Sequence, residues 1–182
     1  MNQIDPQKEP LIKKIFESKA YGIYRKKYPT LLRKPFPYEI GSTLDTYIKN
    51  NVESSSVVTA NSIIARNEIP LENNHNEWVI PYKDAAKDYG KKEIDSLLFE
   101  FTPLYKKQTI KAVKITDLLL KLLNFQDIIY IKVPWSIKPM TGRSGDYLTD
   151  SGYIISAEFI NTYELIQEPQ KNIDEVLNNI EN

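Results

Sequence analysis

The two halves of the sequence resemble each other, and this internal similarity constrains the fold more than any other feature. Three pairs of stretches match in the same order along the chain: YRKKYPTLLRK (24–34) with LYKKQTIKAVK (104–114), VVTA (57–60) with YLTD (147–150), and WVIPYKDAAKDYG (78–90) with YIISAEFINTYEL (153–165). A unit of three or four short strands with one or two helices cannot close a core alone, whereas two such units share their burial. We therefore predict an α+β fold of two related small β-rich units with short helices, packed as one globular body.

Local patterns place the expected elements within this frame. An amphipathic helix is predicted over 7–20, and the prolines that follow predict extended or edge-strand backbone over 28–39. The other predicted helices are 42–51, 82–90 and 116–125, and 172–182 is predicted as either a loosely docked terminal helix or a frayed end. The predicted strands are 55–60, 63–65, 77–81, 96–103, 108–115 and 127–134. The resulting segments are an N-terminal helix (1–21), a first unit (22–90), a connecting strand (91–103), a second unit (104–166) and a polar C-terminal tail (167–182).

Composition excludes several classes of site. The sequence has no cysteine, which rules out disulfides, thiolate zinc sites and cysteine nucleophiles. Its single histidine, His75, lies in the polar stretch LENNHNEW and is predicted to be a solvated loop residue rather than part of a catalytic triad. Lysine plus arginine balances aspartate plus glutamate at 24 each, which disfavours nucleic acid as a partner. We expect no metal site and no cofactor.

The hydropathy pattern predicts a cytoplasmic protein without a membrane partner. The amino-terminal stretch MNQIDPQKEPLIKKIFESKA has no apolar core of signal-peptide length. The longest apolar run, LLLKLLNF (118–125), is interrupted by Lys121 and is too short to span a bilayer. The pattern leaves the oligomeric state open.

The stretch SGDYLTDSGYIISAEFINTYE (144–164) has the form of a strand, a tight turn at 150–152, a second strand and a short helix. Asp146 follows a glycine, where a carboxylate typically accepts hydrogen bonds from backbone amides and holds a turn. Glu158 is predicted at the second position of the helix, where it favours the positive end of the dipole. The functional alternative joins Asp146, Glu158 and Arg143 into a polar cluster for ligand binding or acid–base chemistry.

Basic and aromatic residues recur together in both halves. Lys106 and Lys107 follow Tyr105, as Lys26 and Lys27 follow Tyr24 and Arg25. Cations beside aromatic rings are typical of nucleotide or single-strand binding, and lysines also protect the edges of sheets from unwanted pairing. A ligand-binding set of Tyr105, Lys106, Lys107, Arg143 and Tyr147 is therefore predicted beside the structural alternative.

The second half resembles the small bacterial and phage-associated proteins known for a PGDYG motif. The matching pieces lie within 104–166: Tyr105-Lys106-Lys107, Gly145-Asp146-Tyr147, Tyr153-Ile154-Ile155, Phe159 and Thr162-Tyr163-Glu164. Ser144 replaces the proline of the motif and Leu148 replaces its final glycine. The first half is a weaker copy, with Ser55-Ser56 where Gly-Asp would fall. Because the family has no settled activity, the resemblance implies a fold and a bacterial or phage context rather than a reaction.

Two functional hypotheses follow. The leading hypothesis is a non-enzymatic binding or interaction module whose groove or edge takes up a small-molecule or protein ligand, as the duplication and the 12 tyrosines indicate. The alternative is a small hydrolase or transferase acting on a nucleotide-like substrate. In that enzyme Asp146 and Arg143 of the second copy would work, and the first copy would have become a scaffold.

Overall fold

A computed structural model describes residues 2–48, 51–68 and 76–181 of the chain. It is an α+β protein of antiparallel sheets and short helices, which confirms the predicted fold class. The predicted loop around His75 lies outside the described residues. No helix in the described part of the chain is both long enough and apolar enough to cross a bilayer.

The chain forms two compact units, each assembled from separate stretches of sequence. Unit 1 comprises Met1–Lys27, Thr109–Val133 and Pro139–Asn182, and unit 2 comprises Tyr28–Gln108 and Pro134–Lys138. The predicted segments 22–90 and 104–166 are continuous stretches of sequence, whereas each compact unit combines separate stretches of the chain. The boundaries of the predicted segments stay a prediction.

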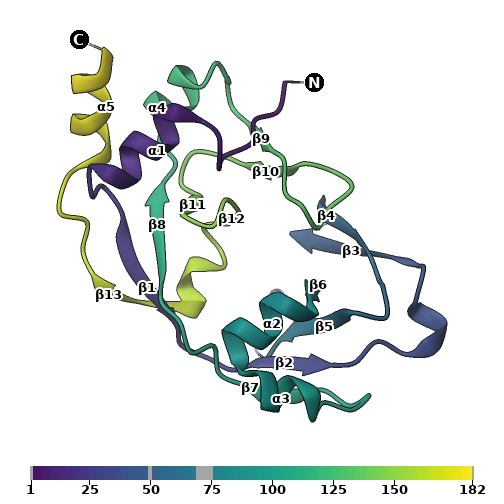
Figure 1. Ribbon diagram of the computed structural model, residues 1–182. Helices are drawn as coiled ribbons and strands as arrows, with labels where there is room; N and C mark the ends of the chain where they lie inside the picture. Colours follow the sequence, from purple (N-terminus) through teal and green to yellow (C-terminus); the bar gives the residue numbers. More distant parts are fainter. Residues whose placement is uncertain (1, 49–50, 69–75, 182) are drawn as a thin grey trace. The chain divides into compact units, whose positions relative to one another are not determined.

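Unit 1 is built on a five-stranded antiparallel sheet in the order β12-β11-β8-β1-β13. Its elements are α1 (Pro10–Glu17), β1 (Gly22–Lys26), β8 (Ile110–Lys114), α4 (Asp117–Leu122), β9 (Ile129–Ile131), β10 (Met140–Gly142), β11 (Tyr147–Thr149), β12 (Ile154–Ile155), the 3-10 helix η2 (Ile160–Thr162), β13 (Tyr163–Gln167) and α5 (Ile173–Glu181). The strands β9 and β10 form a separate pair. Figure 1 shows α1, α4 and α5 grouped together within this unit.

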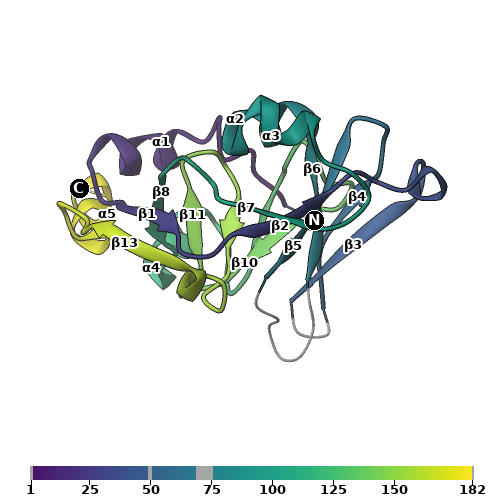
Figure 2. The ribbon, with the colours of Figure 1, turned by 90° about the horizontal axis from the view of Figure 1, so that it is seen from below.

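Unit 2 is built on a four-stranded antiparallel sheet in the order β6-β5-β2-β7. Its elements are β2 (Thr30–Arg33), the 3-10 helix η1 (Pro37–Glu39), β3 (Thr43–Ile48), β4 (Asn51–Val57), β5 (Ser62–Asn67), β6 (Glu77–Pro81), α2 (Tyr82–Tyr89), α3 (Lys91–Asp95) and β7 (Thr102–Leu104). The strands β3 and β4 form a hairpin that lies beside β5 and β6 (Figure 2).

Several predicted helices and their end signals are confirmed. The side chain of Thr116 accepts a hydrogen bond from the amide of Leu119 and caps α4. Gly90 ends α2 with φ at 106°, a conformation that favours glycine. The helix expected in the C-terminal tail is α5, where Val176 and Leu177 are buried. This tail is therefore held by apolar contacts, although most of its surface is polar.

Three local predictions are wrong, and a fourth holds in one of its two alternatives. The segment 42–51, predicted as a helix, contains β3 and the start of β4, because β3 pairs with β4 as an antiparallel hairpin. The connecting segment 91–103 holds α3, and its strand begins only at Thr102. The backbone predicted as extended or edge strand over 28–39 is extended at β2, and this strand lies between β5 and β7 rather than at an edge. The helix predicted after Ser156 is a turn followed by η2, and the chain then continues as β13.

The two sheets share one constraint: each takes a strand from the opposite half of the sequence. In unit 1, β1 pairs with β8, and in unit 2, β7 pairs with β2. The registers are Gly22↔Ala112, Ile23↔Lys111 and Tyr24↔Ile110 in unit 1, and Thr102↔Leu32, Pro103↔Leu31 and Leu104↔Thr30 in unit 2. When residues 24–34 are aligned with residues 104–114, each of these residue pairs in unit 1 falls on the corresponding pair in unit 2. The first strands of the two halves are thus exchanged reciprocally, which supports the predicted duplication.

The remaining strands extend this equivalence and correct part of the sequence alignment. In unit 2 Arg33 pairs with Ile64, and in unit 1 its equivalent Val113 pairs with Leu148. Position 63 therefore corresponds to 147, and Asn61-Ser62 corresponds to Gly145-Asp146. The predicted equivalents Ser55-Ser56 lie instead in β4, paired with β3. The alignment of 57–60 with 147–150 is wrong as well. The strands β3 and β4 form a longer hairpin than β9 and β10, and this difference in length shifts the sequence alignment.

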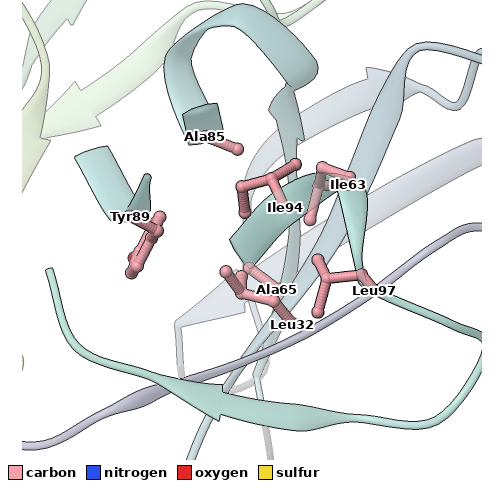
Figure 3. Close-up of a cluster of buried hydrophobic side chains, with 7 residues drawn as sticks. All are labelled: Leu32, Ile63, Ala65, Ala85, Tyr89, Ile94 and Leu97. Carbon is pink, nitrogen blue, oxygen red and sulfur yellow. The ribbon is translucent and has the colours of Figure 1, made fainter. Parts of the chain in front are cut away.

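The core of unit 2 lies between its sheet and its two helices. Figure 3 shows the side chains of Ala85 and Ile94 meeting those of Leu32, Ile63 and Ala65 from the sheet. Ile64 and Val79 face the opposite side of the sheet, where Leu44 of β3 packs against them. Both faces of this small sheet are therefore covered.

The exchanged pairing predicts which engineered cysteines will cross-link. Because the chain has no native cysteine, the double variant I23C/K111C places two thiols on paired positions of β1 and β8. We expect mild oxidation to form a disulfide, detected by peptide mass spectrometry, and to raise the unfolding free energy by about 2–4 kcal/mol.

The matched control is I23C/L31C, which joins the same position of β1 to the equivalent residue of its own half. Since β8 and β13 flank β1 in the sheet, this pair is expected to stay reduced. A disulfide in the control but not in I23C/K111C would show that β1 forms a local hairpin with β2, contrary to the exchange.

Candidate functional site

The carboxylate of Asp146 is occupied by two backbone amides. Its Oδ2 accepts a hydrogen bond from the amide of Arg143 at 2.8 Å, and its Oδ1 accepts one from the amide of Ala157 at 2.8 Å. The first bond closes the turn between β10 and β11, and the second ties that turn to the segment after β12. Asp146 therefore has the turn-holding role, and neither oxygen is left without a donor.

The other residues of the predicted polar cluster belong to the same unit. Arg143 is exposed in the turn that Asp146 closes. Glu158 is half-buried in a turn before η2, so its predicted position at the start of a regular helix is wrong. Tyr147 is half-buried in β11, and its ring meets that of Tyr24 edge-on with centroids 5.9 Å apart. Burial, followed by the interaction with Tyr147, raises the pKa of Tyr24 to about 12.

The predicted basic ligand-binding residues belong to unit 2 and form ion pairs there. Lys106 lies 3.1 Å from Asp88, and Lys107 lies 3.3 Å from Glu93. Tyr105 is exposed beside them, in the segment after β7. The lysines thus hold the end of β7 against α2 and α3, and their role in ligand binding stays a prediction. The structure places this set and the Asp146 set in different units.

Unit 2 contains a cavity that sequence reasoning missed. Its volume is about 510 Å³, and it lies where β2 ends, beside the turn before β5 and the facing ends of α2 and α3. Its apolar lining comes from Pro35, Pro37, Ile40, Ala60, Ile63, Ile94 and Phe99, and its polar lining comes from Lys34, Asn61, Ser62, Tyr82 and Asp95. An apolar cavity with a few polar groups is the usual form of a small-molecule site.

Three aromatic rings form a stack beside this cavity. The ring of Phe36 lies 5.3 Å from that of Tyr38 and 5.7 Å from that of Phe99, with interplanar angles of 6° and 12°. Tyr38 is 80% exposed and Phe99 is 47% exposed. The stack is therefore open to solvent at both ends, and Phe99 belongs to the cavity lining.

A buried ion pair sets the geometry of this stack. The guanidinium of Arg33 donates two hydrogen bonds of 2.7 Å to the two carboxylate oxygens of Glu39. It also lies 4.6 Å from the ring centre of Phe36, whose amide donates to Glu39 at 2.6 Å. The hydrogen bonds from Arg33 hold the pKa of Glu39 below its usual value. Arg33 thus fixes the loop that carries two of the three rings.

The two charged groups in the cavity lining, the Asp95 carboxylate and the Lys34 ammonium, differ in their hydrogen bonding. The Asp95 carboxylate accepts hydrogen bonds from the Lys91 ammonium at 2.6 Å and the Tyr82 hydroxyl at 2.5 Å. These two donors, with a smaller contribution from the charge of Lys34, lower the pKa of Asp95. The ammonium of Lys34 makes no hydrogen bond or ion pair with any residue that the structure describes. Within the described residues, the Lys34 ammonium therefore faces this cavity without a direct hydrogen bond or ion pair, and its charge acts on Asp95 only at longer range.

One pattern in the sequence could have indicated this site. The run RKPFPYE (33–39) alternates charged, proline and aromatic residues, and the prolines present the rings from a stiff backbone. The partner ring, Phe99, lies far along the chain in a stretch predicted as a strand, so the stack was not visible in the pattern. Among the described residues there is no cluster of three or more histidine or acidic side chains suited to a metal ion.

Comparison with protein-family models, curated proteins and solved structures finds no match for the chain. The geometry of the described residues therefore carries the functional argument.

Removing the Asp146 carboxylate tests its turn-holding role. Asp146→Ala leaves the amides of Arg143 and Ala157 without their acceptors, and we expect the unfolding free energy to fall by about 1.5–3 kcal/mol in urea denaturation. The control is Asp150→Asn in the exposed hairpin turn, expected to change stability by less than about 0.5 kcal/mol. Equal stability of D146A and the wild type would contradict the turn-holding role.

The Arg33–Glu39 pair predicts a pH-dependent stability. Glu39→Gln leaves a buried guanidinium without its charge partner, with an expected loss of about 3 kcal/mol at pH 7. Because the pKa of Glu39 is lowered by folding, this stabilisation is full above the unfolded value of 4.5 and disappears as the pH falls through the folded value.

Urea denaturation between pH 7 and pH 3 measures the difference between the wild type and E39Q. The exposed Glu100→Gln serves as the control and is expected to follow the wild type. A difference that stays constant down to pH 3 would show that the charge of Glu39 is not what stabilises the loop.

Proposed function

We propose that the chain is a non-enzymatic binding module whose ligand occupies the cavity of unit 2. The observation that carries the proposal is an apolar cavity of about 510 Å³ with solvent-open aromatic rings at its edge. Cavities of roughly 300–1,000 Å³ suit small ligands, and a concentration of exposed apolar side chains commonly marks a binding surface.

Four exposed apolar residues of unit 2 lie in the lining of this cavity or next to a lining residue in the chain. Ile40 and Phe99 line it while remaining partly exposed, and Tyr38 and Leu98 adjoin them in the chain. The Arg33–Glu39 pair holds the η1 loop in place before any ligand arrives. A site prepared in this way loses little conformational entropy when it binds, which favours affinity.

The enzyme alternative has less support. Both carboxylate oxygens of Asp146 accept hydrogen bonds from backbone amides, so the observed contacts of this residue favour a turn-holding role over a role in a hydrolase or transferase reaction. Binding rather than turnover is therefore the better proposal. The resemblance to PGDYG-motif proteins, the bacterial or phage context and the cytoplasmic location accompany it as proposals.

Binding of small planar aromatic compounds tests the proposal. The protein is titrated with 2-naphthamide, adenosine and 2-naphthoate, and amide shifts are followed by two-dimensional NMR. At least one compound is expected to shift cavity residues, among them Ser62 and Phe99. Phe99→Ala should weaken binding about tenfold, because a stacking surface is lost.

The matched control is Tyr105→Ala, which removes an exposed aromatic side chain that does not line the cavity. We expect this variant to bind as the wild type does. Shifts confined to the surroundings of Tyr105, or no shifts with any compound, would overturn the cavity as the binding site.

A further inference from the structure

The register equivalence places Ser62 of unit 2 where unit 1 has Asp146. Both residues make the same first contact: Ser62 Oγ accepts from the amide of Thr59 at 2.9 Å, as Asp146 Oδ2 accepts from the amide of Arg143 at 2.8 Å. In each case the acceptor lies three residues after the donor and begins the next strand or directly precedes it. The two turns are therefore the same structure with different side chains.

The hydrogen bond that the Oδ1 atom of Asp146 accepts in unit 1 is not reproduced by a side chain in the described part of unit 2. In unit 1 the Oδ1 atom of Asp146 accepts from the amide of Ala157. The equivalent amide in unit 2, that of Tyr82, donates to the carbonyl of Asn61 at 2.7 Å. A serine has one oxygen, already used by Thr59, so unit 2 carries no carboxylate at the place where Ser62 lines the cavity.

The charges around the cavity of unit 2 favour an anion from outside. Lys34, the equivalent of Lys114, has no hydrogen-bond or ion-pair partner within the described ranges 2–48, 51–68 and 76–181. The nearby carboxylate of Asp95 is already compensated by Lys91 at 2.6 Å. The side chain of Asn61, which also lines the cavity, makes no hydrogen bond with a described residue and offers further donors.

The apolar side of the cavity favours a flat ring. Phe99 ends the stack of three nearly parallel rings and lines the cavity, so a planar ligand placed on it continues the stack. Pro35, Pro37 and Ile40 supply apolar walls next to this ring.

We infer that the ligand is a planar aromatic anion, with its ring on Phe99 and its anionic group at Lys34. Ser62, which lines the same cavity, occupies the position that Asp146 has in unit 1. The inference rests on the proposed function and names the chemical class of the ligand. Aromatic carboxylates and nucleoside monophosphates share this chemistry, and the experiment separates them.

Calorimetric titration compares each anion with its neutral counterpart: 2-naphthoate with 2-naphthamide, and adenosine 5′-monophosphate with adenosine. The wild type should bind at least one anion about five- to tenfold more tightly than its counterpart. The pair with the larger preference identifies the carboxylate or the nucleotide as the source. Lys34→Gln should abolish the preference, whereas the exposed Lys87→Gln in α2 should retain it.

A second pair of variants tests position 62 directly. Ser62→Asp supplies the carboxylate that unit 1 has and should weaken anion binding at least about tenfold. Ser62→Asn has a similar shape without the charge and should bind the anion at least about fivefold more tightly than S62D. Thermal unfolding confirms that both variants fold.

The outcomes separate the inference from the proposed function. If anions and neutral compounds bind the cavity equally well, or S62D binds the anion as tightly as S62N does, the anion inference is wrong while the cavity remains the binding site. If neither class binds there, the proposed function fails as well.

Discussion

The reciprocal pairing of β1 with β8 and of β7 with β2 is the constraint on which both units depend. Each sheet is incomplete without a strand from the opposite half of the sequence, and the two registers are the same. Neither half of the chain can therefore bury its core with its own strands. Contacts between residues so far apart in sequence carry a large loop-closure cost, which makes this topology slow to form.

The same strands position the candidate site. The central strand β2 leads from Leu32, which is fully buried in the core, to Arg33, whose side chain is 8% exposed, and then to Lys34 at the cavity. The ion pair between Arg33 and Glu39 folds the next segment back, so that its rings stack on Phe99. In unit 1 the equivalent strand β8 leads instead into Ile115 and the capped helix α4. One framework thus supports an open cavity in one unit and a turn held by its own carboxylate in the other.

Prediction succeeded where local chemistry decides the structure. The helix at 117–122 has its threonine cap, the helix at 82–89 has its glycine stop, and the hairpin at 147–155 has its turn residues. It failed at 42–51, where a polar, threonine-containing stretch has no strong period and the hairpin partner decides the strand. It also failed for the equivalent of Gly145-Asp146, because hairpins of different length shift the alignment and only strand register reveals Asn61-Ser62.

The sequence by itself determined the fold class, most of the helices, the turn-holding chemistry of Asp146 and the similarity of the two halves. These depend on composition, short-range periodicity and residues within a few positions of one another. Only the tertiary structure decided which strands pair, because backbone hydrogen bonds between strands are the same for almost any side chain. It alone brought Phe99, Lys34 and Ser62 to one cavity, since their proximity depends on the register of strands that no local pattern specifies.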